Sequence, residues 1–177
     1  MIVLLTFCLT DFVAVISCLA VVVGVIFGFH TWNKSMTIKR AEYMQSLREK
    51  FYDDKDIAEI VYMADYGVHW YDASFHGGSD RERKVDKLLS VCEHVCYLYD
   101  NKLITRKEFD FFEYDLRRLL TNYDFVAYLF NVYHWSNVTL MVKTPFYQLV
   151  QFGKQMKYFR EDFFDSKSQN YPHFLNF

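Results

Sequence analysis

An uncharged apolar stretch near the N-terminus constrains this chain more than any other feature. Between Phe12 and Phe29 no residue carries a charge, and the first lysine or arginine of the chain is Lys34. A helix of about 20 such residues extends about 30 Å, which matches the hydrocarbon core of a bilayer. We therefore expect a transmembrane segment over residues 1–32, with Trp32 at the membrane interface.

A cleaved signal peptide or a lipoprotein anchor is the alternative interpretation of this stretch. Val15–Cys18 resembles a lipoprotein cleavage box. However, Cys18 is followed by eleven further apolar residues, and no basic residue precedes the stretch as a signal peptide requires. A retained span is the favoured interpretation.

Charge around the span predicts its orientation. Several basic residues follow the span and none precedes it, and they are Lys34, Lys39, Arg40, Arg48 and Lys50. Positively charged flanks stay in the cytoplasm. We therefore expect the N-terminus outside and the C-terminal domain in the cytoplasm.

Two features within the span bear on self-association. Ala20, Gly24 and Gly28 form a row of small residues spaced by four, which lets two helices approach closely in lipid. Asp11 is expected to cap the helix at the outer headgroups. Alternatively, the span slides toward the N-terminus and buries Asp11, which is costly unless the carboxylate is paired in an assembly or lines a water-filled path.

The remainder of the chain is long enough for one helical domain. About 145 residues follow the span, and prolines are rare, with two in the whole chain. With 20 basic and 22 acidic residues the chain is nearly neutral, so no nucleic-acid partner is expected. We expect a membrane-proximal helix over 33–52, a helical cytoplasmic domain over 53–165 and a tail over 166–177 that docks or lies loose. The membrane-proximal helix either continues the span or bends near Asn33–Ser35.

Capping signals divide the domain into helices. Asp53–Asp54 precedes a helix over 55–65, and the capping boxes Ser79–Glu82 and Thr105–Glu108 open two further helices. Asp124 begins another helix, and Pro145 fits the first turn of a last one. The fold class is therefore all-α, an N-terminal transmembrane helix followed by a multi-helix bundle.

Apolar stripes identify the buried faces of these helices. After Ser79 the stripe runs over four turns, and after Thr105 a second stripe follows closely enough to predict an antiparallel hairpin. The expected core positions are Val85, Leu88, Leu89, Cys92, Val95, Cys96, Tyr99, Phe109, Phe112, Leu116, Leu119, Leu120, Phe125, Tyr128, Leu129, Val132, Trp135, Phe146, Leu149, Val150, Met156, Phe159 and Phe163.

The irregular segment Tyr66–Ser79 is the main candidate for a binding site. It combines glycines with a dense group of rings, and loops frequently carry function. Trp70, Tyr71 and Phe75 are the expected anchors for a partner protein. The alternative is that these rings fold back onto the hydrophobic core.

Metal and cofactor chemistry has weak support. Cys92 and Cys96 share the apolar stripe while His94 lies on the opposite side of the helix, so the three cannot converge on one ion. All four cysteines are expected to be thiols. His69, Asp72 and His76 offer ligand types for a metal-dependent hydrolase, but their spacing matches no known ligand signature. We expect no metal, no cofactor and no catalytic residue.

Four stretches give the chain a family resemblance, and they are Lys39–Tyr43, Asp86–Leu89, Tyr97–Ile104 and Glu108–Tyr114. With the N-terminal span, they resemble bacterial single-pass membrane proteins whose helical cytoplasmic domain has no known function. The resemblance implies the bacterial inner membrane as the location and an accessory or defence-associated context.

The leading hypothesis is a non-enzymatic, membrane-tethered interaction or regulatory module, with a protein partner and a possible homo-oligomer. The first alternative is an effector that compromises the membrane by oligomerising its span around Asp11. The second alternative is the metal-dependent hydrolase.

Overall fold

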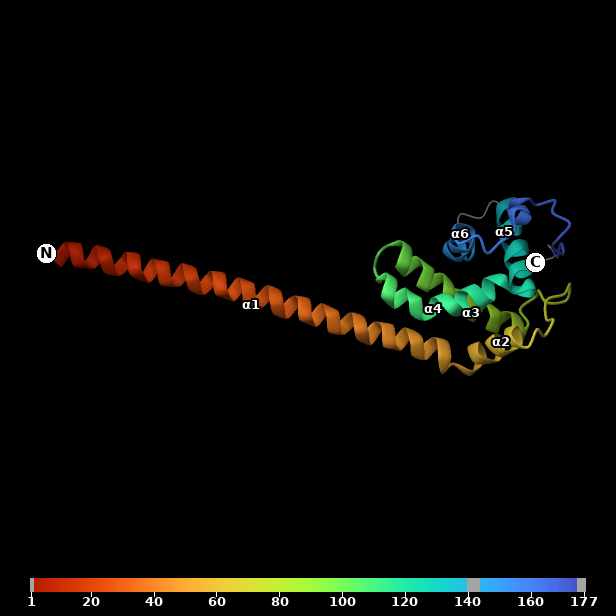
Figure 1. Ribbon diagram of the computed structural model, residues 1–177, viewed down its shortest axis with the longest axis horizontal. Coiled ribbons are helices and arrows are strands. Elements are labelled where there is room, and N and C mark those ends of the chain that lie inside the picture. Colours follow the sequence, from red (N-terminus) through yellow and green to blue (C-terminus); the bar gives the residue numbers. More distant parts are fainter. Residues whose placement is uncertain (1, 140–143, 175–177) are drawn as a thin grey trace. The chain divides into compact units, whose positions relative to one another are not determined.

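The computed structural model of this chain describes the backbone of residues 2–139 and 144–174, and the side chains from residue 12 onward within these ranges (Figure 1). This described part contains six α-helices and one 3-10 helix, joined by loops, and no strand occurs in it. The elements are α1 (Ile2–Tyr52), α2 (Lys55–Asp65), α3 (Asp80–Asp100), α4 (Arg106–Thr121), α5 (Tyr123–Val138), α6 (Tyr147–Gln155) and η1 (Glu161–Phe164). The prediction of an all-α chain is confirmed.

The chain divides into two units, Met1–Leu47 and Arg48–Phe177. In the first unit, α1 passes through Asn33–Ser35 without a break, so of the two alternatives given for this region the continuous helix is the one observed. The large apolar side chains between Phe12 and Phe29 are 49–70% exposed in the isolated chain. By length and composition, this helix can cross a membrane. Its exposure distinguishes it from the core helix of a water-soluble domain.

Local capping explains where the helices of the second unit begin. The Asp54 carboxylate accepts from the N–H groups of Asp56 and Ile57 at the start of α2. Thr105 and Glu108 form the reciprocal capping box that the sequence predicts for α4. At α3 only half of the expected box forms, because Glu82 accepts from the N–H of Gly78 instead of that of Ser79.

Three helices end on a residue with left-handed backbone conformation. Gly67, Lys102 and Lys157 have φ near +60° and follow the C-caps of α2, α3 and α6. In each case the N–H of this residue and that of the residue after it bond back to the last turn, for example Tyr158 N–H to the carbonyl of Gly153 at 2.9 Å. This Schellman arrangement satisfies carbonyls that the helix leaves unpaired.

The helical hairpin of α3 and α4 is present as expected. The ring of Tyr99 near the end of α3 stacks on that of Phe109 near the start of α4, with centroids 4.1 Å apart. The two helices therefore run antiparallel beside each other (Figure 1). The predicted stripes of both helices are buried, apart from Tyr99, which is half-buried.

Helix α5 is more central than its sequence pattern indicates. Its residues from Asp124 to Val132 are all buried, although only one stripe was expected to face the core. The irregular segment covers one part of α5 through Tyr128, and the C-terminal segment covers another through Phe130 and Asn131. The helix continues to Val138.

The last predicted helix is shorter than expected. Helix α6 ends at Gln155, so Phe159 and Phe163 reach the core from the chain after it and from η1. Met156 is 38% exposed and is not a core residue. Pro145 precedes the helix, and Phe146 adopts φ 53° at its N-cap.

The described part of the tail docks on α5. The Asn131 side chain donates to the carbonyl oxygen of Pro172 and accepts from the N–H of Phe174. The Tyr171 ring stacks on Phe130 with centroids 4.6 Å apart. Of the two alternatives for the tail, docking is the one observed up to Phe174.

Candidate protein-interaction surface

The three expected anchors belong to the core. Trp70, Tyr71 and Phe75 are 3%, 1% and 5% exposed. Their rings pack on one another and on the rings of Phe125 and Tyr128 of α5. The expectation that they are displayed to a partner is therefore corrected, and the alternative, in which they fold back onto the core, is the arrangement found.

Asp124 holds the irregular segment in this position. Its buried carboxylate accepts from the N–H groups of Trp70 and Tyr71 at 2.6 and 3.4 Å, and it pairs with His69 Nδ1 at 2.7 Å. Backbone groups of a non-helical segment need such partners when they are buried. The Asp124 carboxylate therefore supplies the hydrogen-bond acceptor that helix carbonyls would otherwise provide to these two N–H groups.

The proposed metal ligands do not converge. His69 contacts Asp124, whereas the Asp72 carboxylate accepts from Ser74 within an exposed turn. His76 lies between the hydroxyl of Tyr71 and the carboxylate of Glu82. No group of three or more metal-binding side chains occurs among the described residues. The geometry gives the hydrolase hypothesis no support.

A buried polar cluster surrounds His76. Its ring stacks on Tyr128, whose hydroxyl donates to Asp86 at 2.6 Å. Burial lowers the pKa of His76 and raises that of Asp86. The side chain of His76 is only 2% exposed, so this cluster is part of the core and offers no access to a substrate.

The two cysteines of α3 are also core residues. Cys92 and Cys96 are free thiols that are 1% and 2% exposed. Burial raises the pKa of both thiols well above the ordinary value. His94 is exposed on the same helix, so it does not join them.

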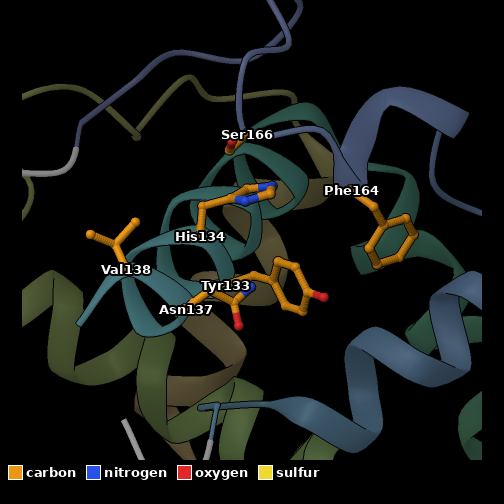
Figure 2. Close-up of a pocket in the computed structure, with 6 residues that line it drawn as sticks. All are labelled: Tyr133, His134, Asn137, Val138, Phe164 and Ser166. Atoms are coloured by element: carbon orange, nitrogen blue, oxygen red, sulfur yellow. The ribbon is translucent and has the colours of Figure 1, made fainter. Parts of the chain in front are cut away.

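A hollow of about 310 Å³ lies where α5 meets the C-terminal segment (Figure 2). The rings of Tyr133 and Phe164 meet edge to face there, and His134 donates from Nε2 to the carbonyl oxygen of Phe163 at 2.9 Å. The residues that line it are Tyr133, His134, Asn137, Val138, Phe164 and Ser166. The hydrogen bond from His134 fastens the C-terminal segment to α5 beside the hollow.

The outer faces of α2 and α4 carry a different arrangement, centred on Arg118. Its guanidinium pairs with Asp65 of α2 and with Asp115 of its own helix, each at 2.8 Å. Asp115 also accepts from the hydroxyl of Tyr52, at the end of α1, at 2.6 Å. Asp115 is 5% exposed, so Arg118 neutralises a buried charge while the Tyr52 hydroxyl adds a hydrogen bond to it.

Exposed aromatic rings surround this ion-pair network. Arg118 lies 5.5 Å from the ring centre of Tyr114, and Arg48 lies 5.9 and 5.2 Å from those of Tyr52 and Phe111. Tyr62 and Tyr66 stack on each other beside Asp65. These nine residues form what we call the aromatic–arginine surface: Arg48, Tyr52, Tyr62, Asp65, Tyr66, Phe111, Tyr114, Asp115 and Arg118.

The five rings of this surface are unusually exposed for their size. Tyr52, Phe111, Tyr62, Tyr114 and Tyr66 are 47%, 55%, 61%, 70% and 79% exposed, in that order. Tyrosine and arginine are enriched at the energetic centres of protein interfaces, where rings lose water and arginine forms directed hydrogen bonds. This composition makes the surface the candidate for protein interaction.

A recess lies within the aromatic–arginine surface. It measures about 250 Å³, and its walls are mostly apolar, with the charges of Asp65, Asp115 and Arg118 among its lining residues. Arg118 Nε is buried and has no hydrogen-bond acceptor in the described part of the chain. An unpaired buried donor costs free energy, so the hydrogen-bonding capacity of this guanidinium is not fully used in the described part of the chain.

The sequence did not predict this surface, because the expected binding site was the irregular segment Tyr66–Ser79 and not a helical face. The available signal was the position of large rings outside the apolar stripes. In α4, Phe111 and Tyr114 interrupt the polar face opposite Phe112 and Leu116. The partners of these rings in α1 and α2 are not adjacent in sequence, so only the fold assembles the surface.

The expected membrane residues lie on α1. Ala20, Gly24 and Gly28 are exposed, and a Cβ at either glycine would meet nothing within 4 Å. The side chain of Asp11 lies outside the described residues. The structure therefore does not test the hypothesis of an effector that oligomerises around Asp11.

Comparisons with protein-family models, with curated proteins and with solved structures found no match for this chain. The class that the structure itself defines is an all-helical protein with one N-terminal helix long and apolar enough to cross a membrane.

Proposed function

We propose that this chain is a membrane-tethered protein-interaction module that acts at the inner face of a bacterial membrane. The observation that carries the proposal is the aromatic–arginine surface, which gathers exposed rings from α1, α2 and α4 around one ion-pair network. A solvated face of a monomeric domain seldom displays so many large rings together.

The tether is supported by α1. Its apolar stretch has the length of a bilayer core, and lysine and arginine follow it but do not precede it. In the proposed topology the N-terminus lies outside and the helical domain lies in the cytoplasm. The row Ala20, Gly24 and Gly28 is the proposed contact between spans.

Topology is tested by protease protection in bacteria that express the full chain with a C-terminal tag. The expected result is that the tagged domain sediments with membranes, survives protease added to intact spheroplasts and is cleaved after lysis. Cleavage in intact spheroplasts, or recovery of the tag in the soluble fraction, would contradict the proposal.

Docking is tested by chemical cross-linking in the same cells. We expect a cross-linked complex above the monomer mass that the double variant Tyr66→Ser/Tyr114→Ser loses. Tyr147→Ser is the matched control, because Tyr147 is a 43% exposed tyrosine of α6 outside the aromatic–arginine surface. Persistence of the complex in the double variant would show that binding occurs elsewhere.

A further inference from the structure

We infer that the aromatic–arginine surface binds the same surface of a second copy of this chain. The inference rests on the proposed function, because it names the partner of the proposed docking surface. Three observations lead to a second copy: the area of the exposed rings, the balance of charge within the surface, and the pairing of projecting rings with a recess.

The exposed area fits one side of a standard interface. Five rings are 47–79% exposed. Since each aromatic side chain presents about 150–250 Å² when fully exposed, they offer together about 500–800 Å² of ring surface. A stable complex of ordinary size buries about 800 Å² on each partner. The rings alone therefore supply most of what a dimer requires.

Charge within the surface favours a copy of itself. Arg48 and Arg118 balance Asp65 and Asp115, so the surface has no net charge. A strongly acidic or basic partner would need an imbalance to recognise. A two-fold interface instead places the same patch of both copies face to face. A patch that carries both signs of charge can face a copy of itself without net repulsion.

The shape of the surface is also self-complementary. The stacked pair Tyr62 and Tyr66 projects into solvent, with Tyr66 79% exposed. A recess of about 250 Å³, lined by Phe51, Ala58 and Val61 among others, lies beside it. We infer that this recess receives an aromatic side chain of the second copy. In a two-fold pair, the projecting ring of each copy enters the recess of the other copy, so the same contact is made twice.

The membrane strengthens such a pair. In the proposed topology all copies lie in one plane with the same orientation, so that a smaller loss of rotational freedom accompanies association than in solution. A two-fold axis along the membrane normal is compatible with that orientation.

The test is site-specific photo-cross-linking of the full chain in living bacteria. The photoreactive residue p-benzoyl-phenylalanine replaces Tyr66 or Tyr114 in one epitope-tagged copy, and a second copy with a different tag is co-expressed. Tyr147 is replaced in the control. We expect a product of twice the monomer mass that contains both tags from positions 66 and 114, at least tenfold more than from position 147.

Each outcome is decisive. A product at positions 66 and 114 that contains another protein and not the second tag would overturn the inference while leaving the proposed function standing. No product at either position, from protein shown to be in the membrane, would overturn both. A product with both tags at similar yield from position 147 would indicate non-specific aggregation and would also overturn the inference.

Discussion

The carboxylate of Asp124 accepts a hydrogen bond from the backbone N–H of Trp70 at 2.6 Å, across 54 residues of sequence. The same carboxylate accepts from the N–H of Tyr71 and pairs with His69. It is therefore the main polar attachment between the irregular segment and α5.

Replacing Asp124 by alanine should leave two buried N–H groups without an acceptor. We expect the free energy of unfolding to fall by about 2–4 kcal/mol. Denaturant unfolding of the full chain in detergent, followed by circular dichroism, measures this change. Asp72→Ala is the control, since its carboxylate bonds only within an exposed turn, and it should alter stability by less than about 1 kcal/mol. Equal effects of the two variants would contradict the role given to Asp124.

Trp70→Ala should behave as a core substitution. The indole contacts the rings of Phe75, Phe125 and Tyr128, and its removal leaves a large cavity. We expect a loss of about 3–5 kcal/mol and a clearly lower melting temperature. Tyr66→Ala, at a highly exposed ring, should leave the melting temperature nearly unchanged. An unaltered melting temperature for Trp70→Ala would restore Trp70 as a surface anchor.

Gly153→Ala separates packing from helix propensity. On propensity alone, alanine within α6 should stabilise the chain by about 1 kcal/mol. However, a Cβ at Gly153 would lie 2.5 Å from Cε2 of Phe159, whose ring is stacked on Phe163 at 4.2 Å. We therefore expect a loss of about 1–3 kcal/mol. The second substitution Phe159→Leu should recover part of it, and a gain for Gly153→Ala alone would refute the packing argument.

Tyr52 should make stability depend on alkaline pH. Partial burial, the hydrogen bond to Asp115 and the charge of Asp115 raise the pKa of Tyr52 to about 12, from an ordinary value of 10.0. The unfolded chain thus loses this proton first as pH rises, so the stabilisation is complete below pH 10 and is lost between pH 10 and 12.

Comparison with Tyr52→Phe isolates this effect, because the other tyrosines titrate in both proteins. Below pH 10 we expect the wild type to be more stable by about 1 kcal/mol, less than the pKa difference alone would imply because water screens the half-exposed side chain. The advantage should disappear by pH 12. A difference that stays constant over this range would exclude the hydrogen bond to Asp115.

Thiol labelling should report the burial of α3. In a Cys8→Ser/Cys18→Ser background, Cys92 and Cys96 are the remaining thiols, and burial raises the pKa of both. Only the accessible thiolate reacts readily with maleimide. Mass spectrometry should therefore find no label on the folded chain and two labels after unfolding. Rapid labelling of the folded chain would place α3 at the surface.

Local rules were sufficient to predict most helix boundaries. The caps Asp54 and Thr105 act within three residues of themselves, so their effect can be read from neighbouring letters. The buried stripes of α3 and α4 follow from their period in the same way. The end of α6 was missed because Lys157 adopts a left-handed conformation that usually marks glycine.

Long-range contacts account for what the sequence did not predict. The rings of the irregular segment turn inward because Asp124 and Tyr128, some 50 residues later, receive them. The aromatic–arginine surface likewise joins Tyr52, Asp65 and Arg118 from three helices. Periodicity describes one element at a time, so it contains no information about which rings remain uncovered after several elements pack.

The attachment of the irregular segment to Asp124 also has a consequence for synthesis of the chain. At elongation rates of about 5–20 residues per second, the 54 residues between Trp70 and Asp124 take roughly 3 to 11 s to translate. During that interval the rings of Trp70, Tyr71 and Phe75 have no α5 to receive them. We therefore expect the nascent chain to bind chaperones during this interval, and slowing the ribosome between these positions should increase aggregation.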